Sequence, residues 1–382
     1  MATSDSETLL YLASEEAVDD FLVDISGVRE IAVDTEGASF HRFVDRIYLL
    51  QVTTRERSAV IDPLPLGKLE QLGSLLENPE VEVVFHDADY DLRLLHQDYG
   101  WSVNRIFDTR IAAQLLGIKS FGLAALLEQF FGVRLDKKHQ RADWSLRPLP
   151  PGMLDYAAQD TRYLLELRDE LKVRLEKLGR SRWAEEEFSR LEGTRWEGDD
   201  GSEAFFRIKG ARDLSRRELA LLRELVPWRD SVARDIDRAT FRVMGNEVLL
   251  EIARTAPMTV KALSGLKGMP RGILDRGATA ILSAVQRGLD IAEEHLPRFP
   301  RAAKWEREED FEERVSKLKA VRDAAATRLS LDPGVLCSRE RLEAIVRNRP
   351  ESLRNLEDIP GLRRWQIAEM GEEFLSALAR NS

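Results

Sequence analysis

The residues of this chain best placed to do chemistry are acidic side chains at the ends of apolar segments. In IAVDTEG, Asp34 and Glu36 stand two apart where an apolar run ends. Residues two apart in a strand point to the same face, so these carboxylates lie together and repel. Such a pair has raised pKa values or takes up a cation, and Mg²⁺ and Mn²⁺ prefer oxygen ligands. A strand running into a polar turn has the same appearance, so this pair alone does not establish a site.

Two further acidic segments follow. HDADYDLRLL comes directly after apolar VEVVF and offers Asp87, Asp89 and Asp91, the last at the start of a predicted helix. In YAAQDTRYLLEL, Tyr156 and Asp160 are four apart and share one helix face. An acidic first turn also suits the helix dipole. For YAAQDTRYLLEL taken alone, an exposed helix face with a partly buried tyrosine is the better explanation. The combination, rather than any one segment, favours a shared acidic site.

The elements that would position these residues are predicted from periodicity. Strands are predicted at residues 31–34, 47–53, 58–61 and 81–85, and helices at residues 66–76 and 91–98. YLLQVTT and SAVIDP are separated by a few polar residues, which predicts a hairpin and therefore a mixed sheet. After Tyr156 the pattern is helical, with glycine and proline at the breaks.

Two candidate linkers, residues 193–201 and 296–310, divide the chain. They predict domains at residues 1–195, 210–295 and 308–382. Each of the two helical blocks opens with an amphipathic helix and later has a glycine turn, KGMPRG or IPGLRR. This shared order suggests a duplication, although two unrelated helical bundles would fit as well.

Composition limits the class of protein. With 43% hydrophobic and 32% charged residues, the 382-residue chain is typical of a globular protein. It shows no signal peptide and no membrane span, so we expect a cytoplasmic protein without membrane association. Cys337 is the single cysteine, which excludes an intrachain disulfide and a cysteine-based zinc site. The net charge of -10 argues against indiscriminate nucleic-acid binding but leaves room for local basic segments.

Several segments resemble the ribonuclease D family of the DEDDy 3'-5' exonuclease superfamily and the related subunit of the eukaryotic nuclear exosome. Over roughly the first 175 residues they are DTEGASFHRF, LLQVTTR, HDADYDLRLL, FDTRIAAQLLG, ADWSLRPLP and YAAQDTRYLLEL. The helical blocks resemble HRDC domains, most clearly in WRDSVARDIDRATFRVMGNEVLLEIA. The resemblance implies a ribonuclease H-like α/β domain, with a mixed central sheet flanked by helices, followed by two small all-α HRDC-like domains.

The resemblance also implies the site residues. The catalytic set becomes Asp34, Glu36, Asp91, Tyr156 and Asp160. Many superfamily members have an asparagine four residues before the second-motif aspartate, where this chain has Asp87. Ribonuclease D relatives place a histidine five residues before it, and His86 meets that spacing, so Asp91 is preferred over Asp87 and Asp89.

The implied mechanism uses two divalent cations, Mg²⁺ or Mn²⁺, about 4 Å apart. Asp34 would touch both, Glu36 and Asp160 would complete the first site, and Asp91 would hold the second, partly through water. Tyr156 would orient the attacking water, because an ordinary tyrosine pKa of about 10 makes it a poor base at neutral pH.

The implied activity is a 3'-5' exoribonuclease, monomeric and without an obligate protein partner, that trims RNA with a single-stranded 3' end and releases nucleoside 5'-monophosphates. Precursors of tRNA are the expected substrates. Phe40 and His86 are candidates for stacking on bases, and Lys138 and Arg141 for lining the backbone track. Core packing is an equally good alternative for Phe40, and solvated loop charges are the more common outcome for residues such as Lys138 and Arg141.

Rival functions remain open. A DNA exonuclease would use the same carboxylates, and contacts to the 2'-hydroxyl would separate the two. A binding protein with a degenerate nuclease fold would have lost a motif carboxylate, yet all four are present. The HRDC-like domains could also bind protein rather than RNA.

Overall fold

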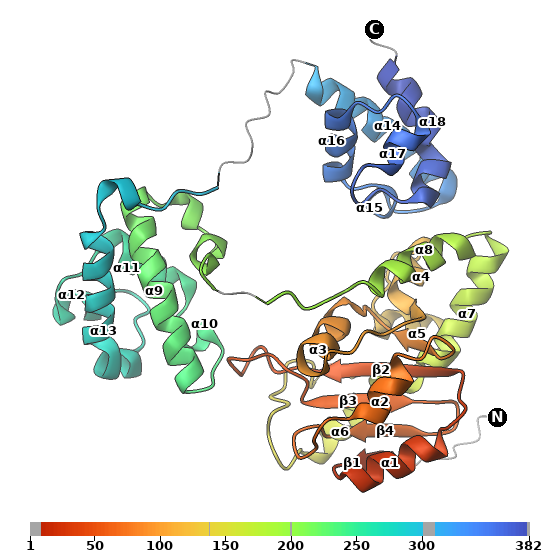
Figure 1. The fold of residues 1–382 in the computed structure, drawn as a ribbon, viewed down its shortest axis with the longest axis horizontal. Helices are drawn as coiled ribbons and strands as arrows, with labels where there is room; N and C mark the ends of the chain where they lie inside the picture. Colours follow the sequence, from red (N-terminus) through yellow and green to blue (C-terminus); the bar gives the residue numbers. More distant parts are fainter. Residues whose placement is uncertain (1–8, 137, 199–200, 301–309, 380–382) are drawn as a thin grey trace.

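The computed structural model describes residues 9–136, 138–198, 201–300 and 310–379. An N-terminal α/β part is followed by two helical modules, one beside it and one packed against its α4 and α8 end (Figure 1). No helix among the described residues has the length and apolar character needed to cross a membrane.

The sheet of the α/β part is mixed, as predicted. It has six strands in the order β1-β4-β3-β2-β5-β6. Strands β2, β3 and β4 pair antiparallel, whereas β1, β5 and β6 join through parallel pairs. The predicted hairpin is therefore confirmed as β3 and β4. The strands are β1 (Leu10–Leu12), β2 (Glu30–Glu36), β3 (Leu49–Thr53), β4 (Ser58–Ile61), β5 (Glu82–Phe85) and β6 (Ile106–Asp108).

The two faces of the sheet are covered by different helices because side chains alternate along each strand. Ile31 and Val33 face one apolar core, which α1 (Glu15–Asp24), α2 (Glu70–Leu76) and α3 (Asp89–Tyr99) cover. Ala32 faces the other side, with α4 (Thr109–Leu115), α5 (Leu123–Phe131), α7 (Leu164–Lys177) and α8 (Ser181–Leu191). Helix α6 (Pro151–Arg162) also covers this second side, above Leu49 and Val60.

Some predicted bounds were wrong. The helix predicted over residues 66–76 begins at Glu70, because Pro63, Pro65 and Gly67 disfavour a helix before it. Helix α3 begins at Asp89, so Asp91 lies within its first turn instead of opening it. Strands β1 and β6 were not predicted, because three residues are too few to show an alternating pattern.

The two helical modules share one order of elements, which supports the predicted duplication. The first contains α9 (Arg216–Asp235), α10 (Thr240–Val243), α11 (Asn246–Thr255), α12 (Val260–Ser264) and α13 (Arg271–Asp290). The second contains α14 (Phe311–Leu329), α15 (Pro333–Leu336), α16 (Arg339–Asn348), α17 (Leu353–Glu357) and α18 (Arg364–Ala379). In both, two long helices enclose three shorter ones.

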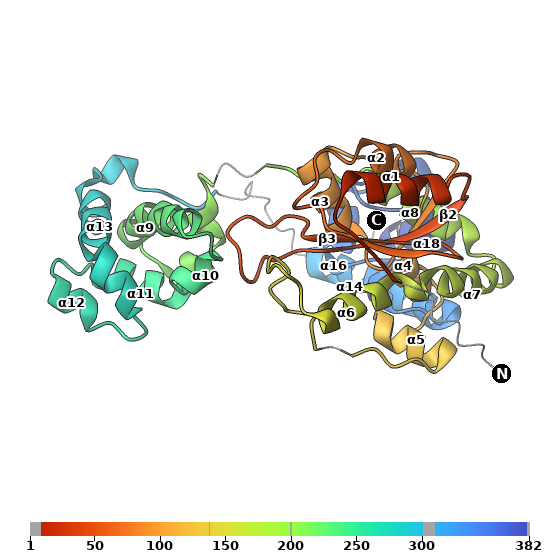
Figure 2. The same ribbon diagram turned by 90° about the horizontal axis from the view of Figure 1, so that it is seen from below.

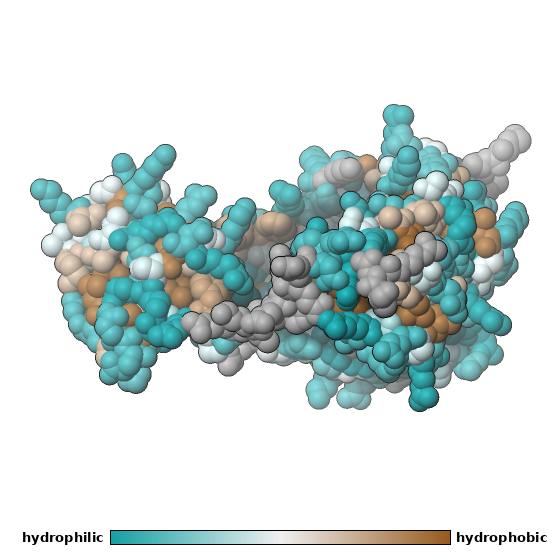
Figure 3. All heavy atoms as spheres, turned by 90° about the horizontal axis from the view of Figure 1, so that it is seen from above, coloured by the Kyte–Doolittle hydropathy of each residue, from teal (hydrophilic) through white to brown (hydrophobic). Residues whose placement is uncertain are grey.

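The second module shares its core with the α/β part. One continuous set of buried apolar residues includes Leu115 and Leu167 of the α/β part and Leu336 and Phe374 of the module. The first module has a core of its own and stands apart in the perpendicular view (Figure 2). The face seen in Figure 3 is mostly hydrophilic, with apolar patches both on the first helical module and on the rest of the molecule.

Polar contacts reinforce the joint between the second module and the α/β part. Trp365 stacks on Trp183 with ring centroids 4.7 Å apart, and its indole nitrogen donates to Glu187 at 3.0 Å. Arg363 donates to the same carboxylate at 2.9 Å. Arg180 donates to the carbonyl oxygens of Leu115 and Leu329, one on each side of the joint. These contacts fix the second module against the α/β part.

Replacement of Trp365 by alanine tests this joint. Because the indole is 4% exposed, we expect the free energy of unfolding to fall by about 3–5 kcal/mol, measured by urea denaturation. Leu353→Ala in the same module is the control, and the half-exposed leucine should cost much less. An equal loss in both variants would contradict a shared core at Trp365.

Candidate active site

The alternation of strand β2 brings the first two carboxylates together. Asp34 and Glu36 share the face of Ala32, which α6 covers. Helix α6 carries Tyr156 and Asp160 one turn apart. Carboxylate oxygens of Asp34, Glu36 and Asp160 lie within 4.8 Å of one another. Residues more than 120 positions apart thus form one acidic cluster.

The described part of the chain places no positive partner beside this cluster. Burial raises the pKa of Asp34 well above its usual range, and the charges of Asp91, Asp160 and Glu36 raise it further. Burial likewise raises the pKa of Glu36, and that of Asp160 to about 7. Among the described residues no lysine, arginine or histidine forms an ion pair with any of them. A divalent cation fits this donor set, since hard cations bind clustered carboxylate oxygens.

The structure distinguishes the three aspartates of the second segment. Asp87 pairs with Arg110, and Asp89 pairs with Arg93 at 2.8 Å, both on the surface. Asp91 is buried, and burial raises its pKa to about 7. Its Oδ1 accepts from the backbone nitrogen of Thr35 at 3.0 Å and from the Thr35 hydroxyl at 2.6 Å. Two hydrogen bonds thus fix one Asp91 oxygen beside the cluster.

Thr35→Val is a direct test of this arrangement. Loss of the hydroxyl frees Asp91 to rotate, so we expect cleavage to slow by about 10- to 100-fold, the usual cost of losing a residue that orients a metal ligand. Thr35→Ser keeps the hydroxyl and should restore most of the rate, measured as initial velocity on a labelled RNA. Equal rates for the valine and serine variants would contradict the orienting role.

Tyr156 is half-buried at the edge of the cluster. Burial raises its pKa, and the charges of Asp160, Glu36 and Asp34 raise it further, so the phenol keeps its proton at neutral pH. His139 packs edge-on at 5.8 Å, and Trp144 lies 6.1 Å away. A fixed, protonated phenol can donate a hydrogen bond, but it cannot serve as a base.

The carboxylates line an open cleft of about 590 Å³, within the roughly 300–1,000 Å³ typical of small-molecule sites. His86 lines it and lies 2.9 Å from the Thr109 hydroxyl. Burial lowers its pKa to about 4, so the imidazole is neutral near pH 7. Other lining residues are Thr35, Asp87, Arg110, Phe121, Gly122, Leu123, Ala124, Ala125, Leu135, Asp136 and Gln140.

The other predicted substrate residues lie outside this lining. Phe40 is 48% exposed, and the Arg141 guanidinium stands over its ring at 5.4 Å. Core packing of Phe40 is therefore wrong. Lys138 is exposed, with its backbone nitrogen donating to Asp136. The structure groups Phe40 with Arg141.

One buried amide near the cluster was missed in the sequence analysis. Gln51 lies directly opposite Asp34 in the β2–β3 pairing, so both side chains point to the same face. Gln51 is fully buried, and neither atom of its amide has a hydrogen-bond partner among the described residues. A polar residue inside the apolar run YLLQVTT was the signal that could have found it.

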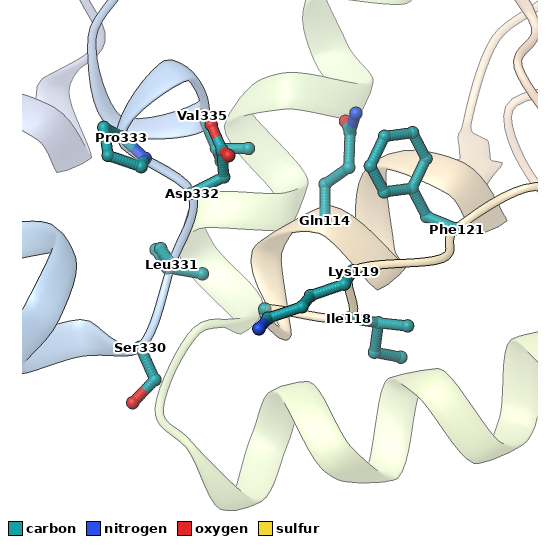
Figure 4. Close-up of a pocket in the computed structure, with 10 residues that line it drawn as sticks. Gln114, Ile118, Lys119, Phe121, Ser330, Leu331, Asp332, Pro333 and Val335 are labelled. Carbon is teal, nitrogen blue, oxygen red and sulfur yellow. The ribbon is translucent and has the colours of Figure 1, made fainter.

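A second cleft adjoins the first, between the α/β part and the second module. Gln114, Lys119 and Phe121 form one wall, and Ser330 and Leu331 belong to the other (Figure 4). Phe121 also lines the carboxylate cleft, so the two clefts are neighbours. The second module therefore borders the approach to the acidic cluster.

Comparison with known proteins places these features in a family. A 3'-5' exonuclease domain matches residues 11–176, and an HRDC domain matches residues 218–285 and again 311–378. The chain is 31% identical to ribonuclease D of Gluconacetobacter diazotrophicus over 92% of its own length and 90% of that protein. It is 33% identical to ribonuclease D of Xanthomonas oryzae, over 84% and 86%.

Solved structures agree with these matches. The crystal structure of Escherichia coli RNase D, described as an exoribonuclease involved in structured RNA processing, is similar with a TM-score of 0.75. It is 25% identical and covers 98% of this chain and 99% of its own. The similarity extends through the α/β part and both helical modules.

Proposed function

The chain belongs to the ribonuclease D family and is a 3'-5' exoribonuclease, and from this premise we propose that it uses two divalent cations to trim structured RNAs such as tRNA precursors. The partly buried cluster of Asp34, Glu36 and Asp160, with which no cationic side chain among the described residues forms an ion pair, is the observation that carries the proposal. The substrate class is supported by the E. coli relative, which is described as acting in structured RNA processing.

We also propose the bounds of the domains, the oligomeric state and the location of the protein. The exonuclease domain spans residues 1–195, and the HRDC-like domains span 210–295 and 308–382. The protein works as a monomer in the cytoplasm, where RNA precursors are made in bacteria such as those of its relatives.

We assign the metal ligands from the cluster. Asp34, Glu36 and Asp160 would hold one Mg²⁺ or Mn²⁺, and Asp91 with Asp34 would hold the second. Asp91 is not part of the group that lies within 4.8 Å, which suits a separate site. When bound, the ions supply a water of lowered pKa and offset the charge that develops on the leaving 3'-oxygen.

The chain's own residues do the positioning. Thr35 fixes Asp91 through two hydrogen bonds. The protonated Tyr156 donates a hydrogen bond that holds the attacking water in line with the scissile phosphate. The neutral His86 offers a flat ring in the cleft against which a terminal base can stack.

The test is a cleavage assay on 5'-labelled single-stranded RNA and matched DNA, with Mg²⁺, with Mn²⁺ or with chelator. We expect a ladder that shortens RNA from its 3' end, depends on metal and yields nucleoside 5'-monophosphates. A labelled tRNA precursor with a 3' trailer tests the substrate class.

Two other outcomes of this assay would contradict the proposed function. Faster cleavage of DNA than of RNA would overturn the RNA assignment and favour a role in DNA repair. Binding without cleavage in the presence of both metals would show that the carboxylates do not assemble a working site.

A further inference from the structure

The loop over residues 37–46, between β2 and β3, leaves the catalytic strand and reaches the first helical module (Figures 1 and 2). The backbone nitrogen of Ala239 donates to the His41 carbonyl at 3.2 Å. The backbone nitrogen of Phe43 donates to Asp237 at 3.3 Å, and Arg242 donates to the carbonyl of Phe40. The loop therefore joins the nuclease part directly to α10 and to the connection between α9 and α10.

Two acidic groups at this junction, Asp237 and Asp143, are paired with one arginine. Arg42 pairs with Asp237 of the first module at 3.2 Å and with Asp143 of the α/β part at 3.7 Å. It also donates to the Ser145 hydroxyl at 2.6 Å. Arg42 thus links the loop to the first module and to the α/β part, and its charge offsets those of two carboxylates.

Aromatic rings stay exposed at the same junction. Phe40 of the loop and Phe241 of α10 are 48% and 52% exposed, and their rings meet edge to face at 6.5 Å. Each ring has a guanidinium beside it, Arg141 at 5.4 Å from Phe40 and Arg242 at 5.8 Å from Phe241. Arg234 lies over Phe43 at 5.1 Å.

The positive charges of these arginines are available to bind an anion. In the described parts of the chain, Arg141, Arg234 and Arg242 form no ion pair with a carboxylate. The chain has a net charge of -10, so this group of exposed aromatic rings and arginines without carboxylate partners is a local positive region. We call Phe40, Phe241, Arg141, Arg234 and Arg242 the junction platform.

We propose that the junction platform binds unpaired nucleotides of the RNA upstream of the 3' end that occupies the cleft. Bases stack on exposed aromatic rings, and guanidiniums bind phosphates and stack as well, which together is the chemistry of a single-strand site. The inference rests on the proposed function and adds a second contact region, shared between the nuclease part and the first module.

The platform is close enough to the cleft for one strand to reach both. Phe40 follows Glu36 by four residues, which span at most about 14 Å even when fully extended. Arg141 follows Gln140, and Gln140 lines the cleft. A strand of a few nucleotides can therefore pass from the acidic cluster to the platform.

Binding without cleavage isolates this contact. Fluorescence anisotropy in chelator would compare a labelled 12-nucleotide RNA with a 3-nucleotide RNA on the full chain. We expect Phe241→Leu to weaken binding of the 12-mer by about 5- to 30-fold, the effect of losing one stacking ring. Phe241→Tyr keeps the ring and should bind within about twofold of wild type, and the trimer should be affected far less.

Met258→Ala is the matched control, a 53% exposed apolar side chain of the same module whose loss should leave both affinities unchanged. Thermal unfolding of each variant excludes loss of fold. Unchanged 12-mer affinity in Phe241→Leu, while wild type still trims the trimer with metal, would overturn the platform and leave the exonuclease intact. In that case a protein partner would be the better occupant.

A second measurement does not depend on variants. A 4-thiouridine placed about four to eight nucleotides from the 3' end should crosslink to the peptide containing residues 234–242 or to the loop over residues 37–46. Crosslinks confined to other peptides would contradict the proposal.

Discussion

Asp34→Asn is expected to slow RNA cleavage by at least about 10³-fold and to stabilise the metal-free protein. Burial raises the pKa of Asp34, and the charges of Asp91, Asp160 and Glu36 all raise it further. An uncharged amide of the same size removes this repulsion and also removes a ligand needed for the cation. Cleavage rate and thermal unfolding in chelator should therefore move in opposite directions.

Asp89→Asn is the control for this substitution. Asp89 is exposed, lies in the same region and pairs with Arg93, so its loss should change neither property by much. Loss of both activity and stability in Asp34→Asn would mean that the side chain has a structural role. Retained activity would remove Asp34 from the site.

The metal-free protein is expected to lose stability as the pH rises from about 5 to about 8. Asp91 and Asp160 have pKa values of about 7 in the folded protein, against 3.8 ordinarily. Between those values the folded state binds more protons than the unfolded state, so the free energy of unfolding falls with rising pH. The loss is of the order of a few kcal/mol, is steepest below about pH 7 and levels off near about pH 8.

Added Mg²⁺ or Mn²⁺ should reverse this trend at pH 8, because cations that bind only the folded state stabilise it. Urea denaturation at pH 5, 6, 7 and 8, with metal and with chelator, gives both curves. Asp34→Asn should flatten the chelator curve. A chelator curve that rises toward pH 8 would contradict an uncompensated acidic cluster.

Local sequence was sufficient for the parts of the site that lie within one element. The two-residue spacing of Asp34 and Glu36 on a strand, and the four-residue spacing of Tyr156 and Asp160 on a helix, each fix a shared face. The apolar runs of β3 and β4 with their short connection predicted the antiparallel hairpin for the same reason. The side-chain period of a strand or a helix depends only on local backbone geometry, so it can be read from the spacing of residues in the sequence.

The choice among chemically equivalent residues could be explained only from the tertiary structure. Asp87, Asp89 and Asp91 have the same chemistry and lie within five positions, and family spacing alone preferred Asp91. Burial beside Thr35 and the surface pairs of the other two now give that preference a physical reason. Gln51 was not recognised, because its proximity to Asp34 arises from strand pairing.

The sequence by itself determined the acidic motifs, the mixed sheet and the repeated helical modules, because each follows from spacing within a segment. Tertiary structure alone decided how the modules are used. The second shares a core with the nuclease part, whereas the first meets it through a loop where Phe40 and Phe241 come together. Contacts between residues about 200 positions apart depend on long-range packing of complementary surfaces, and no local pattern encodes them.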